Sequence, residues 1–223
     1  ANEAGRQIGN GRVLVLTHTH AASDVFAERA NGSSRAVEVA TLDSHIVEIA
    51  RVYHQALGLP VDTAAWARSQ GSDGYASLAE MVAKLLARAP MISSAIARRY
   101  PIIICDEHQD ATPNQHAIIM AVHEAGARAR IFGDPMQRIF PERTRKGQSP
   151  PIDTWEQLRG SADVFDKLDT PHRWSDGSPQ LGDWVLGARD ALQSARPIDL
   201  RQRPDSVHVV MADNVSQSRK QYQ

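Results

Sequence analysis

The chain has 223 residues, 42% of them hydrophobic and 23% charged, with a formal net charge of -1. This length suffices for one large domain with a sizeable core, and the composition is ordinary for a soluble globular protein. The near-neutral charge excludes a uniformly basic nucleic-acid coat, although a local basic groove is compatible with it. No apolar run approaches the roughly 18 residues that a membrane span requires.

The first residues, "ANEAGRQIGNG", lack the basic and apolar regions of a signal peptide. The single cysteine, Cys105, excludes an intrachain disulfide and fits a reducing compartment. We therefore expect a cytoplasmic protein without membrane association. Because the sequence begins without an initiator Met, we also expect a fragment of a longer chain.

Strand-like and helix-like segments alternate from the N-terminus onward. Helices are expected over 20–30 and 43–57, and residues 60–99 show helical patterns only. Strands are expected at 12–17, 36–41, 101–105, 128–132, 163–168 and 206–211. Apolar strands separated by helices predict an α/β fold with a parallel sheet covered on both faces.

One helix is marked at both ends by its sequence. Thr112 is suited to the N-cap, Pro113 to the first helical position, Gln115 to the return bond of a capping box, and Gly126 to the end. Asp73 is suited to cap an earlier helix, "YASLAEMVAKLLARA".

Polar residues follow each of the first five expected strands. They are Thr17 and Thr19, Thr41 and Asp43, Asp106 and Glu107, Gly133 and Asp134, and Asp169 with Arg173. Carboxyl ends of parallel strands meet at one edge of a sheet, where open α/β sheets bind ligands. The pattern therefore predicts a ligand site at that edge.

Asp106 and Glu107 come straight out of the apolar run "IIIC". Two adjacent carboxylates there repel each other and lose hydration, and a bound Mg²⁺ would relieve both effects. Asp106 would then hold metal-bound water while Glu107 faces an attacking water, a division of roles suited to phosphoanhydride hydrolysis. The alternative is a solvated acidic loop.

The longer segment "IIICDEHQDATPNQ" resembles the Walker B and DExQD box of UvrD/Rep-type superfamily 1 helicases. "RIFGDPMQRIF" resembles motif III of that family, and "VLVLTHTHAASDVFAER" resembles motif Ia. "VATLDSHIVEIAR" is similar to the next DNA-contacting motif, and "LDTPHRWS" to motif IV. The resemblance implies a RecA-like P-loop NTPase domain that uses ATP and Mg²⁺ and binds single-stranded DNA.

The resemblance also implies roles in the nucleotide site. Asp106 would bind Mg²⁺ through water, Glu107 would be the catalytic base, and Gln137 and Arg173 would reach the γ-phosphate. Gln109 and Asp110 would link the nucleotide and DNA sites. The implied nucleotide-binding set comprises Asp106, Glu107, Gln109, Asp134, Gln137 and Arg173.

Six further residues are implied in DNA binding: Thr17, Thr19, His20, Thr41, Asp43 and Phe140. The threonines would meet phosphate through hydroxyl or backbone amide groups. Many relatives carry a base-stacking tryptophan after motif III, whereas this chain has Glu142 near that point. Phe140 or Trp155 would have to supply the stacking instead.

Each assignment has a structural alternative. The three threonines could be ordinary helix N-caps, Gln137 could bond to its own loop, and Arg173 could be a surface arginine. His108 reads as a wall residue. A zinc site built from Cys105, His108, His116 and His123 is disfavoured because its spacing does not suit a tetrahedron.

The phosphate-loop pattern G-x-x-x-x-G-K-[ST] does not occur in the sequence, and neither do motifs V and VI. We therefore expect the chain to lack the first P-loop strand. Residues 1–45 and 100–175 would form a partial RecA-like domain, 46–99 a small helical insertion, and 176–223 the start of a second motor domain.

The leading hypothesis is the motor of an ATP-dependent DNA helicase or translocase, inactive as this chain alone. The resemblance suggests DNA repair as the setting, with a partner nuclease or repair proteins. Two alternatives stay open: an ATPase switch that grips DNA without unwinding it, and a catalytically dead DNA-binding or assembly module.

Overall fold

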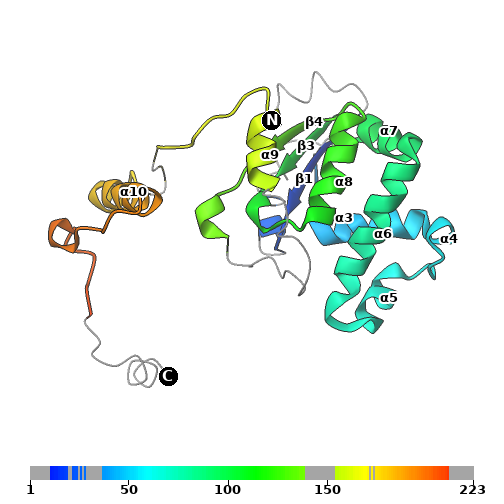
Figure 1. The fold of residues 1–223 in the computed structure, drawn as a ribbon, viewed down its shortest axis with the longest axis horizontal. Helices are drawn as coiled ribbons and strands as arrows, with labels where there is room; N and C mark the ends of the chain where they lie inside the picture. Colours follow the sequence, from blue (N-terminus) through cyan, green and yellow to red (C-terminus); the bar gives the residue numbers. More distant parts are fainter. Residues whose placement is uncertain are drawn as a thin grey trace. The chain divides into compact units, whose positions relative to one another are not determined.

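The computed structural model describes residues 11–19, 22–24, 26, 28, 37–138, 154–170, 172 and 174–210 (Figure 1). The chain divides into two compact units, Ala1–Ala162 and Asp163–Gln223. The first unit contains the sheet. The two units divide between residues 162 and 163, whereas the sequence analysis places the end of the RecA-like domain at residue 175.

The described sheet has four parallel strands in the order β2-β1-β3-β4. They are β1 (Val13–Thr17), β2 (Val37–Thr41), β3 (Ile102–Cys105) and β4 (Arg128–Ile131). The α/β class, the parallel sheet and the first four strands predicted from sequence are confirmed. The architecture is consistent with a RecA-like domain.

Burial differs from strand to strand for a simple reason. All residues of β1 are buried, because this strand has a neighbour on each side and helices over it. In β4, Arg128 and Arg130 are exposed and alternate with half-buried residues, and this strand pairs only with β3 in the described sheet. Charged side chains on an edge strand discourage pairing with other chains.

The helices of the first unit lie in the predicted helical regions, apart from the last one, for which no helix was predicted. They are α3 (Leu42–Val52), α4 (His54–Leu57), α5 (Thr63–Ser69), α6 (Gly74–Arg88), α7 (Pro90–Arg99), α8 (Pro113–Glu124) and α9 (Thr154–Ser161). The helix expected over 43–57 is broken at Tyr53, and α4 ends at Gly58 in the left-handed region, with φ of 67°. Of the helix expected over 20–30, residues 22–24, 26 and 28 are described and are helical.

The two predicted N-caps have different outcomes. Thr112 caps α8 and Gln115 completes the capping box, as predicted. Asp73 occupies the N-cap position of α6, but its side chain makes no capping bond, so that prediction is wrong. Gly74 matters more there, because a Cβ at this position would lie 1.8 Å from the carbonyl oxygen of Ala67. Only glycine lets α6 approach α5 this closely.

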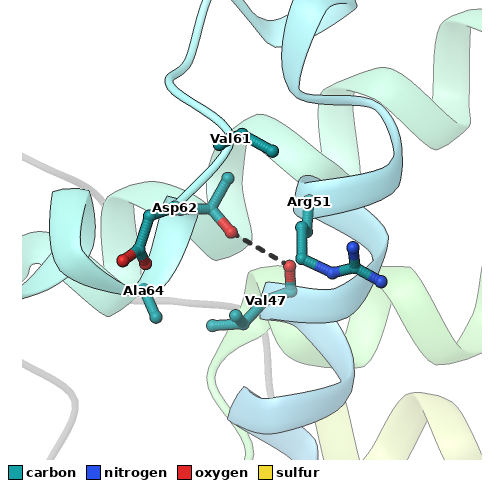
Figure 2. A pocket seen from close by; sticks show the side chains of 6 residues that line it. Val47, Arg51, Val61, Asp62 and Ala64 are labelled. Carbon is teal, nitrogen blue, oxygen red and sulfur yellow. Dashed lines mark hydrogen bonds between the residues drawn. The ribbon is translucent and has the colours of Figure 1, made fainter.

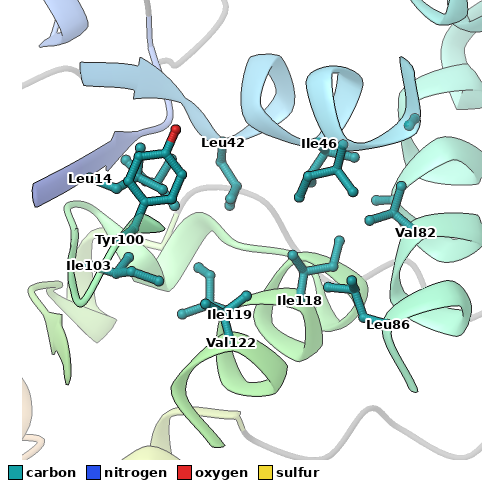
Figure 3. Close-up of a cluster of buried hydrophobic side chains, with 14 of the residues drawn as sticks. Leu14, Leu42, Ile46, Val82, Leu86, Tyr100, Ile103, Ile118, Ile119 and Val122 are labelled. Atoms are coloured by element: carbon teal, nitrogen blue, oxygen red, sulfur yellow. The ribbon is translucent and has the colours of Figure 1, made fainter. Parts of the chain in front are cut away.

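One hydrophobic core joins the sheet to the helices of residues 42–99 (Figure 3). Leu14 and Ile103 contribute from the sheet, Ile46 from α3, Leu86 from α6 and Ile119 from α8. Each such side chain contributes about 1.5–3 kcal/mol on burial. The helical segment therefore shares its core with the sheet.

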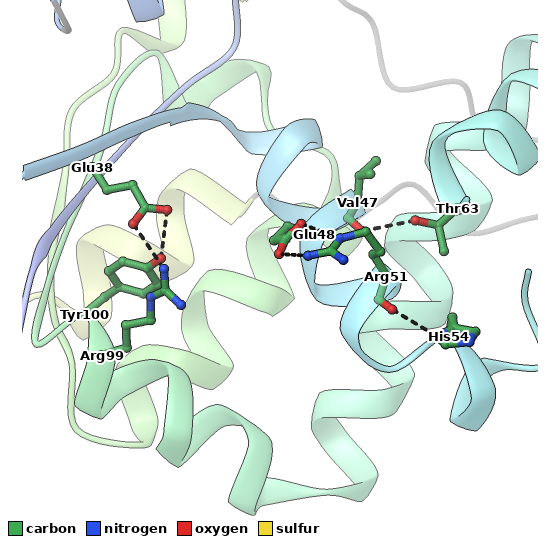
Figure 4. A network of polar contacts seen from close by, with 8 residues as sticks. All are labelled: Glu38, Val47, Glu48, Arg51, His54, Thr63, Arg99 and Tyr100. Carbon is green, nitrogen blue, oxygen red and sulfur yellow. Dashed lines mark hydrogen bonds and ion pairs between the residues drawn. The ribbon is translucent and has the colours of Figure 1, made fainter. Parts of the chain in front are cut away.

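A polar network ties the amino ends of the strands to α7 (Figure 4). The Glu38 carboxylate accepts hydrogen bonds from the Tyr100 hydroxyl at 2.9 Å and from Arg12 Nη1 at 3.2 Å. Arg99 Nη2 also donates to Glu38, at 3.4 Å. Burial raises the pKa of Glu38, but the hydrogen bonds from Tyr100 and Arg12 outweigh it and leave the pKa below its ordinary value.

Two predicted strands are wrong in the second unit. Residues 163–168 have no regular structure, and Val164 and Leu168 are 83% and 82% exposed. Residues 206–210 are not a strand either, and residue 211 lies outside the described residues. An apolar run becomes a strand only beside a ladder partner, and neither run has one in the described part of the chain.

The main described element of the second unit is α10 (Pro179–Gln193), of which only Gly182 is fully buried. Across both units, no helix in the described ranges is long and apolar enough to cross a membrane.

Candidate functional site

The carboxyl ends of the strands lie level with one another at one edge of the sheet. Thr17 pairs with Thr41, Leu16 with Cys105, and Cys105 with Ile131. The ladder continues by one bond, because the backbone N–H of Asp106 donates to the carbonyl of Leu16 at 2.9 Å. Four of the five predicted rows of polar residues therefore converge. The fifth row follows no strand: Asp169 lies in an irregular segment of the second unit, and Arg173 lies outside the described residues.

Glu107 has a backbone conformation that is rare for its residue type. Its φ of 51° and ψ of 40° lie in the left-handed region, immediately before the 3-10 turn η2 (His108–Asp110). A non-glycine residue there costs roughly 1–3 kcal/mol and persists only where the surroundings hold it. Backbone strain of this kind is concentrated at functional sites.

Asp106 is half-buried beside the exposed Glu107. Burial raises the pKa of Asp106, and the negative charge of Glu107 raises it further; the N–H of Glu107 and the charge of His18 act in the opposite direction. The neighbouring Asp110 has a buried Oδ1 with no hydrogen-bond partner. The site therefore has an excess of carboxylate charge that a cation would neutralise.

This donor set fits Mg²⁺. That ion takes one or two protein carboxylates and keeps several waters, so it needs no cage of protein ligands. No cluster of three or more His, Cys, Asp or Glu side chains suited to a metal occurs within the described ranges. Asp106 would be the protein ligand, directly or through water.

Gln109 connects the strand-end carboxylates to the loop after β4. Its Nε2 donates to Glu107 Oε2 at 2.6 Å, and its Oε1 accepts from the backbone N–H of Asp134 at 2.9 Å. The buried Gln109 amide thus has both ends engaged. It holds the Glu107 carboxylate at a set place relative to Asp134.

Asp134 organises the next turn, η3 (Pro135–Gln137). Its carboxylate accepts from the N–H of Met136 at 3.0 Å and from Gln137 Nε2 at 2.7 Å. Gln137 therefore bonds to its own loop, which was the structural alternative. Its predicted role at a γ-phosphate stays a prediction.

Gly133 is enclosed by two side chains. A Cβ at this position would lie 2.8 Å from Gln109 Oε1 and 2.9 Å from Cζ3 of Trp155, which belongs to α9. Trp155 thus packs against the loop after β4, and glycine is required for that contact.

The threonines at the strand ends use their hydroxyls within the protein. Thr41 caps α3 by accepting from the N–H of Ser44 at 3.1 Å. Thr19 accepts from the N–H of Ala22 at 3.2 Å, and the buried Thr17 donates to the carbonyl of Thr19 at 3.0 Å. Their predicted contacts with DNA are not tested by this geometry.

His18 is a site residue that sequence reasoning missed. It is half-buried after β1, and burial lowers its pKa. Four carboxylates raise the pKa against that effect: Asp110, Asp43, Glu107 and Asp106. The available signal was its position between Thr17 and Thr19, both of which the sequence analysis assigned to the same edge.

His108 is buried, and its Nε2 lies 3.0 Å from Nδ1 of His116 on α8. Burial, together with the charges of His116 and His18, lowers the pKa of His108 to about 3. A neutral, packed imidazole agrees with the expected wall residue.

Three predicted site residues, His20, Phe140 and Arg173, lie outside the described residues. A shallow pocket of about 280 Å³ lies elsewhere, between α3 and the start of α5 (Figure 2). Val47, Arg51, Val61 and Asp62 line it, and no predicted site residue does.

One family of known proteins matches part of this chain. Residues 63–146 match the family model of the UvrD/REP helicase N-terminal domain. The matched range contains β3, Asp106–Asp110, α8, β4 and η3, so the resemblance inferred from motifs II and III is confirmed. The match implies a helicase-related function, and helicases of this family generally bind ATP and Mg²⁺. No curated protein matches the chain.

Proposed function

We propose that this chain is part of the motor of a UvrD/Rep-type DNA helicase or translocase, in which ATP hydrolysis drives movement along single-stranded DNA. The observation that carries the proposal is the bridge made by Gln109. It joins a strained carboxylate, Glu107, to the Asp134 loop, within the range that matches the helicase domain. A solvated acidic loop would need neither the strain nor the bridge.

The residues of this edge divide the chemistry among them. Mg²⁺, held by Asp106, would supply positive charge against the phosphate oxygens. Glu107 acts as the base that orients the attacking water and accepts its proton. Gln109 keeps the Glu107 carboxylate in place, since its amide donates to Oε2. Gln137 and Arg173 are assigned to the γ-phosphate by the resemblance alone.

The DNA side of the proposal rests on backbone groups and on Asp43. The hydroxyls of Thr17, Thr19 and Thr41 are engaged within the protein. Phosphate contacts at this edge would therefore come from backbone N–H groups, with His20 and Phe140 assigned by resemblance. Single-stranded DNA is the proposed partner, with a nuclease or repair proteins beside it.

One second function has a specific observation in its favour. The phosphate-loop pattern is absent from these 223 residues. A catalytically dead helicase-like module would bind DNA or assemble with partners without hydrolysing ATP.

The deciding experiment is single-strand-stimulated ATP hydrolysis by the product of the complete gene, compared with its Glu107→Gln variant. Loss of a catalytic base costs about 10²–10⁴ in rate, so the variant should fall by at least about 10². Glu124→Gln, at the exposed end of α8, is the matched control and should keep full activity. DNA binding without any hydrolysis by the unaltered protein would favour the catalytically dead module.

A further inference from the structure

We propose that Gln115 is a positioning residue that holds the N-terminus of α3 against the DEHQD segment, residues 106–110. The geometry rests on one side chain that is 8% exposed and uses both ends of its amide. Gln115 Oε1 accepts from the backbone N–H of Thr112 at 2.8 Å. Gln115 Nε2 donates to Oδ1 of Asp43 at 2.7 Å, across 72 positions of sequence.

The second bond is not needed by the helix that carries Gln115. In a capping box the N3 side chain has only to accept from the N-cap backbone, a role that glutamate fills as well as glutamine. The amide nitrogen is what distinguishes the two, and here it donates to a carboxylate on another element. Hydrogen bonds to ionised acceptors are about twice as strong as neutral ones.

The bond from Gln115 to Asp43 also connects two segments whose strands are not paired with each other. Asp43 lies in the first turn of α3, two positions after Thr41, the last residue of β2. Gln115 lies in α8, which follows β3 through the DEHQD segment. Strands β2 and β3 are not neighbours, because β1 lies between them. Gln115 therefore links the segment after β3 directly to the segment after β2, although β1 separates the two strands.

His18 occupies the end of β1 between these segments, and both Asp43 and Asp110 act on it electrostatically. A displacement of the α3 N-terminus must therefore carry the start of α8 with it or break a buried bond. This inference rests on the proposed function for its consequence: Asp43 is on the DNA side and residues 106–110 are on the nucleotide side. Through Gln115, a movement of the α3 N-terminus on the DNA side would displace the segment that follows β3 on the nucleotide side.

An exchange of the two side-chain types tests the bridge. Gln115→Glu keeps the acceptor for Thr112 but sets a carboxylate against Asp43. Adding Asp43→Asn restores one donor and one acceptor with their roles reversed. Thr112→Ala, the matched control, removes the cap side chain and leaves the Asp43 bond in place.

The first readout is amide hydrogen exchange of the 223-residue chain, followed in peptides covering 41–46 and 106–112, with α6 as internal reference. Gln115→Glu should speed exchange in both peptides about tenfold, and the double variant should return it to within about twofold. Thr112→Ala should affect the second peptide only. Faster exchange confined to the second peptide, or a double variant that does not recover, overturns the proposal.

The second readout is ATP hydrolysis by the product of the complete gene. Gln115→Glu should lower the DNA-stimulated kcat about tenfold while the basal kcat and the KM for ATP stay unchanged. An equal fall in basal and stimulated rates overturns the coupling role. If the unaltered protein hydrolyses no ATP, the proposed function fails, and hydrogen exchange still decides whether Gln115 positions the α3 N-terminus.

Discussion

Gln109 Nε2 lies 2.6 Å from Glu107 Oε2, within a segment where Glu107 adopts a left-handed backbone. The same Gln109 amide accepts from the N–H of Asp134 at 2.9 Å. Gln109 thus connects the Glu107 carboxylate to the loop after β4 and orients that carboxylate before any ligand binds. Such preorganisation suits the role of base that is proposed for Glu107.

Gln109→Glu should lower DNA-stimulated ATP hydrolysis by about 10², because a carboxylate in place of the amide repels Glu107 and misplaces it. The acceptor for Asp134 is retained, so the fold should survive. The measurement is steady-state hydrolysis at saturating DNA. Gln55→Glu on α4 adds the same charge at an exposed site and serves as the control. Full activity in Gln109→Glu would mean that the bridge does not position Glu107.

Gly133→Ala should destabilise the first unit by about 1–3 kcal/mol, because the added Cβ meets Gln109 and the ring of Trp155 at under 3.0 Å. Urea unfolding followed by circular dichroism measures the change. Gly160→Ala in α9 is the control: a Cβ there meets nothing within 4 Å, so stability should hold or rise slightly. Gly133→Ala should cost less in a Trp155→Ala background than in the unaltered chain, because the ring that the Cβ meets is then absent. Equal effects of the two glycine changes would refute the close packing.

Asp106→Asn should raise the stability of the metal-free chain and abolish its response to Mg²⁺. In the absence of Mg²⁺, the free energy of unfolding should rise by a few tenths of a kcal/mol, because the repulsion from Glu107 is removed at a partly solvent-screened site. The unaltered chain should gain stability as Mg²⁺ is added, and EDTA should reverse the gain. The variant should show neither response. A Mg²⁺ response that persists in Asp106→Asn would exclude Asp106 as the ligand.

His45 should make the first unit sensitive to acid. It is buried edge-on against Tyr100, with ring centroids 5.7 Å apart, and burial lowers its pKa from 6.5 to about 4. The unfolded chain therefore binds a proton between pH 6.5 and 4 that the folded chain excludes, so stability falls as the pH is lowered through that range. The loss should approach about 3 kcal/mol.

Replacing His45 with Phe keeps the ring and removes the titrating group. The slope of unfolding free energy against pH should flatten between pH 6.5 and 4 in His45→Phe. A slope unaltered by His45→Phe would place the acid sensitivity elsewhere in the chain.

In the first unit, the sequence predicted correctly those features that depend on a single short segment, namely the strands and the capping box. The runs 12–17, 36–41, 101–105 and 128–132 are strands to within one residue at each end. The capping box of Thr112 and Gln115 also formed as predicted. The runs 163–168 and 206–211 carried a similar apolar signal and are not strands in the described residues, because no ladder partner lies beside them.

The sequence by itself determined the parallel sheet, the acidic strand end at Asp106 and Glu107, and the resemblance to UvrD/Rep helicases. These depend on side-chain periodicity and short spacings, which a chain displays without folding. Only the tertiary structure decided which side chains meet: Gln109 with the Asp134 loop, Gln115 with Asp43, and His18 among four carboxylates. Those contacts join residues from different elements, and their geometry comes from strand order and register.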